Sequence, residues 1–288
     1  MTGTRLRSLE ADVERLANDP NAVQAPDAAR IVGDLLDALE RGEVRAARRS
    51  EDGQWSAVPW VKRGILLAFR TGTMVDMSPD TSAGRAVFSF IDKHTVPPRA
   101  MGVAEGVRIV PGGSTIRRGA YVAPGVVCMP PMYINVGAHV GTGTMVDSHA
   151  LVGSCAQVGE RVHLSAAAQV GGVLEPVNAS PVVIEDDVVV GGNCGVYEGT
   201  VVGRRAVLAA GVVLTRGTPV FDLVERRIHR AQAERPLVIP AGAVVVPGAR
   251  AVRDEWGEAQ GLSLQTPIIV KYRDEKTDAS TALEQWLR

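Results

Sequence analysis

An aliphatic or small apolar residue recurs at every sixth position through the second half of the chain, and this repeat limits the possible folds more than any other feature. The register runs from Val110 to Val170, resumes at Ile184 after a slip of eight residues, continues to Val220 and returns at Ile239. An amphipathic helix needs a period of about 3.6 residues and an ordinary strand a period of about 2. A period of six predicts a short strand and a turn, repeated, with one aliphatic side chain pointing inward per repeat.

Such a chain is expected to form a parallel β-solenoid, in which stacked coils are hydrogen-bonded about 4.8 Å apart. Each buried Val, Ile or Leu side chain contributes roughly 1.5–3 kcal/mol, so a long register of them can stabilise a fold with few aromatic residues. Aromatic residues make up 4% of this chain, whereas 31 of its 288 residues are glycine, which suits thin and regular layers. The alternative, an all-β sandwich, would require the valine spacing to recur by coincidence along the whole register.

The sequence outside the register has other patterns. Apolar residues at helical spacing predict three helices, over residues 6–16, 31–39 and 61–69. An Asp-Gly pair within the segment 44–55 predicts a short strand pair. These elements together favour a small helical domain ahead of the solenoid.

The chain is therefore expected to be mainly β and to divide into three parts. Residues 1–105 form the N-terminal helical domain, and residues 106–255 form the solenoid. Residues 256–288 form a C-terminal extension, with a strand over 262–272 and a short helix over 282–287.

Charge and cysteine usage exclude several classes of protein. The 31 Lys and Arg residues nearly balance the 32 Asp and Glu residues, which argues against nucleic acid as a partner. No apolar run approaches the roughly 18–20 residues that a membrane-spanning helix needs, and the N-terminus lacks the apolar centre of a signal peptide. Cys128, Cys155 and Cys194 fit neither a zinc pattern nor a disulfide set. We expect a soluble cytoplasmic protein without a structural metal.

Several segments are more specific than the repeat. Gly-Thr-Met-Val-Asp at 143–147, Val-Gly-Ser-Cys-Ala-Gln at 152–157 and Gly-Gly-Val-Leu-Glu-Pro at 171–176 follow one another, and Trp-Val-Lys at 60–62 lies upstream. In this order and spacing they resemble the bacterial tetrahydrodipicolinate N-succinyltransferases, a family of hexapeptide-repeat acyltransferases. The resemblance covers nearly the whole chain.

This resemblance implies a left-handed parallel β-helix in which three hexads make one triangular coil. It also implies a homotrimer whose active sites lie between neighbouring β-helices. The implied reaction belongs to lysine and diaminopimelate biosynthesis: a succinyl group moves from succinyl-CoA to the amino group of the ring-opened substrate, 2-amino-6-oxopimelate. Succinyl-CoA is then a co-substrate, and neither a metal nor a tightly bound cofactor is expected.

The resemblance assigns the central role to Asp147, the last residue of the 143–147 motif. It matches the residue that holds the substrate amine, and it is expected to act either as the general base or as a nucleophile through an acyl anhydride. Arg108 matches a residue that binds a substrate carboxylate, for which a guanidinium offers planar bidentate donors. Glu198 is a candidate second carboxylate for the substrate. His163, in contrast, is expected to be a hydrogen-bonded structural residue.

The acyl chain and the CoA arm need small residues, backbone donors and a cation. The candidates for binding them are Ser165, Gly171, Gly172, Ala209 and Lys271.

The chain departs from the family pattern at a few positions. Gly141 and Thr142 stand where the family usually carries Asp-Glu, His149 replaces an aromatic residue, and Gly195 stands where some members carry a Glu. We expect Gly141, Thr142 and His149 to lie near Asp147. The departures leave open an altered acceptor or acetyl-CoA as the donor. A non-catalytic β-helix, such as a trimeric scaffold, is the alternative from another class.

Overall fold

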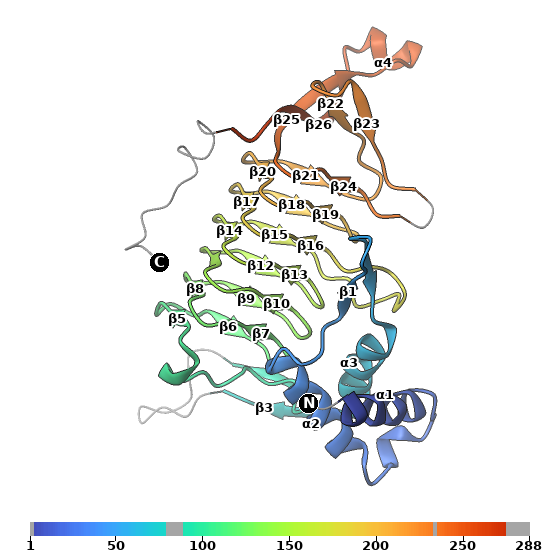
Figure 1. Cartoon of the computed structure of the whole chain (residues 1–288), viewed down its shortest axis with the longest axis vertical. Coiled ribbons are helices and arrows are strands. Elements are labelled where there is room, and N and C mark those ends of the chain that lie inside the picture. The colour runs from blue at the N-terminus through green and yellow to red at the C-terminus, as the bar shows by residue number, and fades with distance from the viewer. Residues whose placement is uncertain (1–2, 79–88, 233–234, 275–288) are drawn as a thin grey trace.

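The computed structural model describes residues 3–78, 89–232 and 235–274. It is elongated, with the N-terminal helices at one end of a stack of coils and a long hairpin at the other (Figure 1). Nearly every hexad forms a strand of two residues, and most of these strands have a half-buried first residue and a buried second residue. The predicted inward position is therefore the second residue of each strand.

The strands stack into three parallel sheets, which form the three faces of a triangular prism and are named here faces 1, 2 and 3. Face 1 contains β7 (Tyr121–Val122), β10 (His139–Val140), β13 (Gln157–Val158), β16 (Val183–Ile184), β19 (Val201–Val202) and β24 (Val238–Ile239). Face 2 contains β5 (Arg108–Ile109), β8 (Val127–Cys128), β11 (Met145–Val146), β14 (His163–Leu164), β17 (Val189–Val190), β20 (Val207–Leu208) and the start of β25 (Ala243–Ala251). Face 3 contains β6 (Thr115–Ile116), β9 (Tyr133–Ile134), β12 (Leu151–Val152), β15 (Gln169–Val170), β18 (Gly195–Val196) and β21 (Val213–Leu214).

The chain runs from face 1 to face 2 to face 3 and back, and its turns form edges named here 1–2, 2–3 and 3–1. Equivalent residues in successive coils are register partners, as Val140 is of Val158 and Val152 is of Val170. All four of these side chains are completely buried. The predicted fold class, a left-handed parallel β-helix with an N-terminal helical part, is confirmed.

The predicted register is wrong at its two ends. Ile109, not Val110, is the partner of Cys128, because one extra residue separates β5 from β6 and carries the chain around Gly112 and Gly113 at positive φ. At the other end the chain leaves the coils after Leu214.

Val220 does not continue face 1, because Ile239 of β24 takes the place above Val202. Val220 instead begins β22 (Val220–Asp222), which pairs with β23 (Arg227–His229). Its side chain is still fully buried and covers the end of the core.

The three predicted helices are confirmed as α1 (Gly3–Ala17), α2 (Ala28–Glu40) and α3 (Pro59–Thr71), with the short turn η1 (Ala22–Gln24) between the first two. Proline suits the first position of α3 because that position needs no N–H donor. Their apolar faces form a second core, and Val136 and Cys155 of the β-helix also belong to it. The helices therefore pack directly against the lower coils, as Figure 1 shows.

The predicted strand pair is confirmed as β1 (Ala47–Arg49) and β2 (Trp55–Ala57), an antiparallel arm that lies along the β-helix. A second small pair, β3 (Met74–Asp76) and β4 (Ile91–Lys93), and the turn η2 (Val103–Glu105) connect the helices to the first coil.

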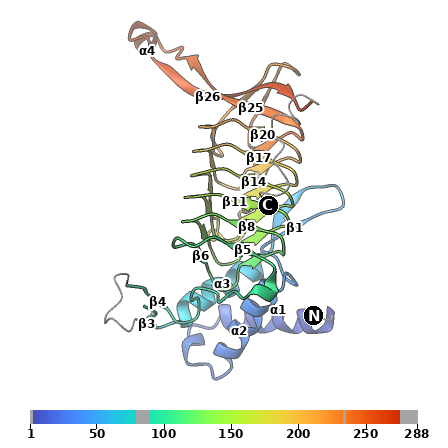
Figure 2. The same ribbon diagram turned by 90° about the vertical axis from the view of Figure 1, so that its left-hand side faces the viewer.

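At the far end, β25 pairs with β26 (Ser263–Tyr272), and α4 (Glu255–Ala259) lies between them. Figure 2 shows this hairpin projecting beyond the coils. The strand predicted over 262–272 is confirmed, whereas the helix predicted over 282–287 lies outside the described residues. None of the described helices is both long enough and apolar enough to cross a membrane.

Candidate active site

Asp147, Ser165 and Ala209 lie in one column on the 2–3 edge. Each directly follows a strand of face 2, and each donates its backbone N–H to the coil above: Asp147 to Leu164 O at 2.9 Å, and Ala209 to Val245 O at 2.8 Å. Successive members of such a column are one coil, about 4.8 Å, apart. The β-helix therefore brings together three of the predicted site residues that are far apart in the sequence.

Gly191 completes this column between Ser165 and Ala209, and the sequence analysis missed it. A Cβ on Gly191 would lie 2.6 Å from the backbone nitrogen of Ala210 and 2.7 Å from Leu208 O. No side chain fits there, so the column presents a hydroxyl, bare backbone and a methyl group in succession above Asp147. An extended ligand can lie along such a surface.

The Asp147 carboxylate is half-buried and has a single described partner. Its Oδ1 accepts a hydrogen bond from the backbone N–H of Ser148 at 2.7 Å. Among the described residues no Lys, Arg or His lies within ion-pair distance of it. The second oxygen can therefore accept a hydrogen bond from an ammonium or amine group of a ligand.

Arg108 lies on the same side of the prism, on face 2. It is the register partner of Val127, which in turn is the partner of Met145, so Arg108 lies two coils below Met145. Two coils correspond to roughly 10 Å along the axis. The Arg108 side chain is exposed. His163 is the next member of this row, directly above Met145.

Gly171, Gly172 and Glu198 lie on the 3–1 edge, away from Asp147 in the same chain. A Cβ on Gly171 would lie 2.7 Å from the Tyr197 ring, and one on Gly172 would lie 2.6 Å from the backbone nitrogen of Ser154. Close packing therefore requires both glycines. Glu198 Oε2 accepts a hydrogen bond from the backbone N–H of Arg216 at 2.8 Å, so this carboxylate links its own turn to the next coil.

Tyr197 is another residue that the sequence analysis missed. A Cβ on Gly195 would meet its ring at 2.4 Å, and Gly171 lies against the same ring. The glycine at position 195, a departure from the family pattern, thus leaves the space in which the Tyr197 ring lies along face 3. The available signal in the sequence was a tyrosine, a rare residue in this chain, two residues after Gly195.

Lys271 lies on β26 opposite Val244, which stands above Val207 on face 2. It is therefore near the top of the side that carries Asp147. Its ammonium group forms an ion pair with Asp274 at 3.2 Å, and its side chain stays 44% exposed.

The four departures from the family pattern do not lie together. His149 is exposed in the turn just after Asp147, at the 2–3 edge, as expected. Gly141 and Thr142 lie at the 1–2 edge, before β11, so the expectation that they lie beside Asp147 is wrong. One strand of face 2 separates the two turns, and successive edges of the prism face different directions.

The fold and the 2–3 edge together define a class, the hexapeptide-repeat acyltransferases. Two family models match the chain: "Tetrahydrodipicolinate N-succinyltransferase N-terminal" over residues 8–71 and "Hexapeptide repeat of succinyl-transferase" over residues 181–216.

Curated relatives extend the match to nearly the whole chain. The 2,3,4,5-tetrahydropyridine-2,6-dicarboxylate N-succinyltransferase of Polynucleobacter asymbioticus is 39% identical over 97% of this chain and 97% of its own length. The enzyme of the same name from Acinetobacter baylyi is 38% identical over 97% of each chain. This chain belongs to the tetrahydrodipicolinate N-succinyltransferase family of enzymes.

A solved structure shares the fold. It is a putative 2,3,4,5-tetrahydropyridine-2-carboxylate N-succinyltransferase from Campylobacter jejuni, with a TM-score of 0.53 and 19% sequence identity. The match covers 83% of this chain and 62% of that one.

Proposed function

We propose that this chain transfers the succinyl group of succinyl-CoA to the amino group of 2-amino-6-oxopimelate, the ring-opened form of tetrahydrodipicolinate, with Asp147 as the base. The observation that carries this proposal is the open carboxylate of Asp147 at the foot of the Ser165–Gly191–Ala209 column. Family membership supplies the reaction class, and the column supplies a place for the acyl donor.

The carboxylate of Asp147 performs two tasks in this mechanism. It first holds the substrate ammonium group, which loses one proton to solvent and becomes the neutral amine. It then accepts a second proton as the amine nitrogen attacks the thioester carbonyl. The C–N bond forms, the C–S bond breaks, and the leaving CoA thiolate takes up the proton held by Asp147, which restores the carboxylate. Arg108, about two coils below, binds a carboxylate at the far end of the substrate through its planar donors.

The co-substrate is proposed to lie along the 2–3 edge. The small residues Ser165 and Ala209 leave room for the pantetheine arm, and the bare backbone at Gly191 allows close approach. Lys271, near the top of the same side, can reach a CoA phosphate if it exchanges Asp274 for that partner. No tightly bound cofactor is needed for the reaction.

The complete site is proposed to form between protomers of a homotrimer. Asp147 lies on the 2–3 edge, whereas Gly171, Gly172 and Glu198 lie on the 3–1 edge, so one chain cannot close both sets around one substrate. A cyclic trimer has heterologous interfaces, which bring two different surfaces of the same chain together. In such an assembly the 2–3 edge of one protomer faces the 3–1 edge or face 3 of its neighbour.

The enzyme is proposed to act in the cytoplasm, where CoA thioesters and the lysine and diaminopimelate intermediates are found. Small molecules are its proposed ligands, and neither nucleic acid nor a membrane has a part in the reaction.

A direct assay tests the proposal. The purified protein is incubated with tetrahydrodipicolinate and either succinyl-CoA or acetyl-CoA, and the released CoA thiol is measured. We expect turnover with succinyl-CoA and a much lower kcat/KM with acetyl-CoA. The absence of turnover with succinyl-CoA would refute the assignment, and a preference for acetyl-CoA would change the donor.

Sedimentation of the purified protein tests the assembly. A trimer is expected, and a fully active monomer would contradict a site shared between protomers.

A further inference from the structure

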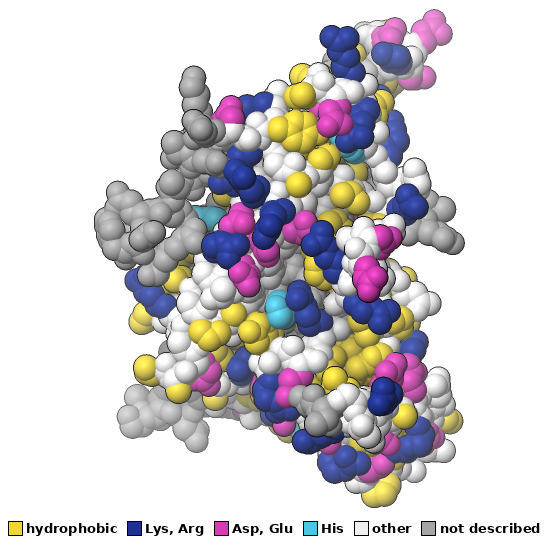
Figure 3. All heavy atoms as spheres, in the orientation of Figure 1, with side chains coloured by type: hydrophobic (Ala, Val, Ile, Leu, Met, Phe, Trp, Pro, Cys, Tyr) yellow, Lys and Arg dark blue, Asp and Glu magenta, His cyan; other side chains and the backbone are white. Residues whose placement is uncertain are grey.

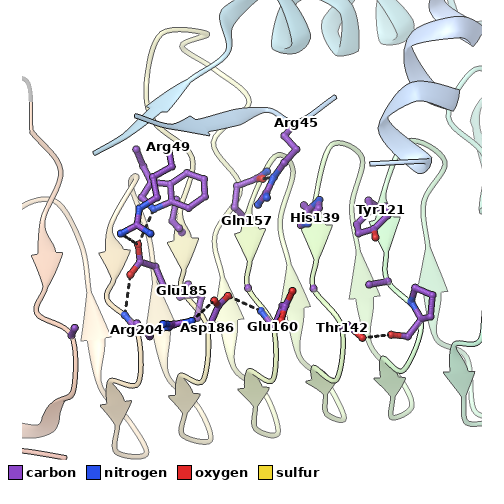
Figure 4. Close-up of a pocket in the computed structure, with 18 residues that line it drawn as sticks. Arg45, Arg49, Tyr121, His139, Thr142, Gln157, Glu160, Glu185, Asp186 and Arg204 are labelled. Atoms are coloured by element: carbon purple, nitrogen blue, oxygen red, sulfur yellow. Dashed lines mark hydrogen bonds and ion pairs between the residues drawn. The ribbon is translucent and has the colours of Figure 1, made fainter. Parts of the chain in front are cut away.

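A groove lies on face 1, away from Asp147. It has a volume of about 810 Å³ and runs between the β1–β2 arm and the coils, as the close-up in Figure 4 shows. Figure 3 shows interleaved basic and acidic side chains around a hollow on this side of the molecule. The proposed reaction uses none of the residues that line this groove.

Arg45 is the group that gives this groove a specific chemistry. It lies two residues before β1 and reaches down to the coils, where its Nε donates to Oε1 of Gln157 at 2.9 Å. Its guanidinium carbon lies 5.6 Å from the centre of the Trp55 ring. The other nitrogens of this guanidinium, Nη1 and Nη2, have no hydrogen-bond partner among the described residues.

Gln157 holds this guanidinium in a fixed position. The Gln157 side chain is buried, and its Nε2 donates to the backbone oxygen of Cys155 at 2.8 Å. The amide therefore cannot rotate without losing a hydrogen bond in the interior, and its Oε1 stays directed at Arg45 Nε. The two terminal nitrogens of Arg45 are left as a fixed pair of donors on the groove wall.

The acidic side chains of the groove already have partners. Glu185 accepts from the Trp55 ring nitrogen at 3.0 Å and lies 3.4 Å from Arg49, and Asp186 pairs with Arg204 at 3.2 Å. Glu160 pairs with Arg161 at 2.7 Å. No carboxylate of the described chain lies within ion-pair distance of Arg45. The nearest acting carboxylate is that of Asp186, whose charge favours the charged form of Arg45 from a greater distance while it pairs directly with Arg204.

Two aromatic rings line the groove on the coils below Arg45. The rings of Tyr121 and His139 are stacked with their centres 4.4 Å apart and an angle of 20° between their planes. Nδ1 of His139 is buried and has no hydrogen-bond partner in the described structure. Burial, together with the charge of Arg45, lowers the pKa of His139 to about 3, so this ring is neutral and does not compete for an anion.

We propose that the face-1 groove binds a small planar organic carboxylate, whose carboxylate group lies on Arg45 and whose ring lies against the Tyr121–His139 stack. A partly buried guanidinium with no counter-ion in direct contact is costly, and a carboxylate with two oxygens matches its two free nitrogens. The paired acidic side chains on the rim repel ions of higher charge, so a monocarboxylate fits better than a phosphate. Pro124, which is exposed on the groove wall, supplies an apolar contact for the ring.

Calorimetric titration of the full-length protein with benzoate tests the proposal. Benzamide serves as the neutral analogue of the same shape, cyclohexanecarboxylate as the non-planar carboxylate, and sulfate as the inorganic anion. We expect saturable binding of benzoate, weaker binding of cyclohexanecarboxylate, and no measurable binding of benzamide or sulfate.

Two variants place the ligand in the groove. Arg45→Met keeps the length of the side chain and removes its charge, and it should weaken benzoate binding by about tenfold to a hundredfold, as expected for a charge-assisted hydrogen-bonded pair. Thr142→Glu adds a carboxylate to the groove wall, at an exposed position, and should weaken benzoate binding even if Arg45→Met folds poorly. Arg30→Met, at an exposed arginine of α2, is the matched control and should leave binding unchanged.

Several outcomes would overturn the proposal. Binding of benzoate that Arg108→Met removes and Thr142→Glu leaves intact would place the ligand at the Asp147 side. Equal binding of sulfate would reduce the groove to a general anion site. No binding of benzoate at all would mean that Arg45 acts in the fold alone. None of these results bears on succinyl transfer, which the thiol-release assay measures separately.

Discussion

Replacing Asp147 with asparagine separates its chemical role from its part in the fold. The one described hydrogen bond of the side chain, from the Ser148 N–H to Oδ1 at 2.7 Å, can be accepted equally well by an asparagine oxygen. The side chain has no described ion pair to lose. We therefore expect the free energy of unfolding to change by no more than about 0.5 kcal/mol.

The effect of Asp147→Asn on catalysis should be far larger. An amide can neither hold an ammonium group by charge nor accept its proton. General base catalysis contributes about 10²–10⁴-fold, so kcat should fall by that factor, equivalent to roughly 3–5 kcal/mol in the activation barrier. The assay is release of the CoA thiol from succinyl-CoA, with chemical denaturation of the same sample as the test of folding.

Asp187→Asn is the matched control, because Asp187 lies in a turn of the 1–2 edge and pairs with Arg161 at 2.7 Å. It makes the same chemical change on another edge and should leave kcat within about twofold. If Asp147→Asn kept more than about a tenth of the wild-type activity, the assigned role would be wrong. A loss of activity accompanied by unfolding would instead support a structural carboxylate.

Three further predictions concern the framework. Leu164→Ala leaves a cavity in the fully buried core and should cost about 2–5 kcal/mol in denaturant unfolding; a loss below 1 kcal/mol would contradict the packing. Burial alone would raise the pKa of the Asp222 carboxyl, but hydrogen bonds from two backbone N–H groups, the Tyr272 hydroxyl and a histidine hold it below its usual value. Its contribution to stability is therefore present above pH ~4 and lost as the pH falls through the lowered pKa, and Asp222→Asn should flatten that part of the stability profile. Lys62→Met leaves the backbone oxygen of Ala179 without its 2.5 Å partner, and we expect a loss of about 1–3 kcal/mol and a raised KM for the acyl donor, whereas unchanged kinetics would show that the 171–183 loop needs no such support.

The repeat predicted the β-helix because each strand of a coil places one residue inward, at the same position of its hexad. A side chain such as Val152 is buried between the equivalent residues one coil below and one coil above, Ile134 and Val170, so the spacing in the sequence is the spacing in the structure. The register failed at Val110 and Val220, where a coil has a neighbour on one side only. There, one extra residue or an inserted hairpin decides the path of the chain, and hexad spacing carries no information about either.

The position of a residue in the repeat also determines the edge of the prism on which it lies. For this reason Asp147, Ser165 and Ala209 lie in one column. Their roles in binding and catalysis stay predictions. Gly191 and Tyr197 were not predicted, because a glycine that follows an inward residue reads as an ordinary turn. The importance of Gly191 depends on the backbone at 208–210, one coil above, and that of Tyr197 depends on Gly195 beside it and on Gly171, one coil below.

The contacts between the helical part and the coils could not be predicted from the sequence. Through them the helical part shapes a groove and supports a loop, besides covering the lower coils. Arg45 meets Gln157 across 112 positions, Trp55 meets Glu185 across 130, and Lys62 meets Ala179 across 117. Hexad periodicity describes only neighbours that lie about eighteen residues apart, so it is silent about all three. The first two contacts build the face-1 groove, and the third supports the loop that contains Gly171 and Gly172. A single N-terminal segment therefore contacts both the face-1 groove and the loop proposed to border the acyl site.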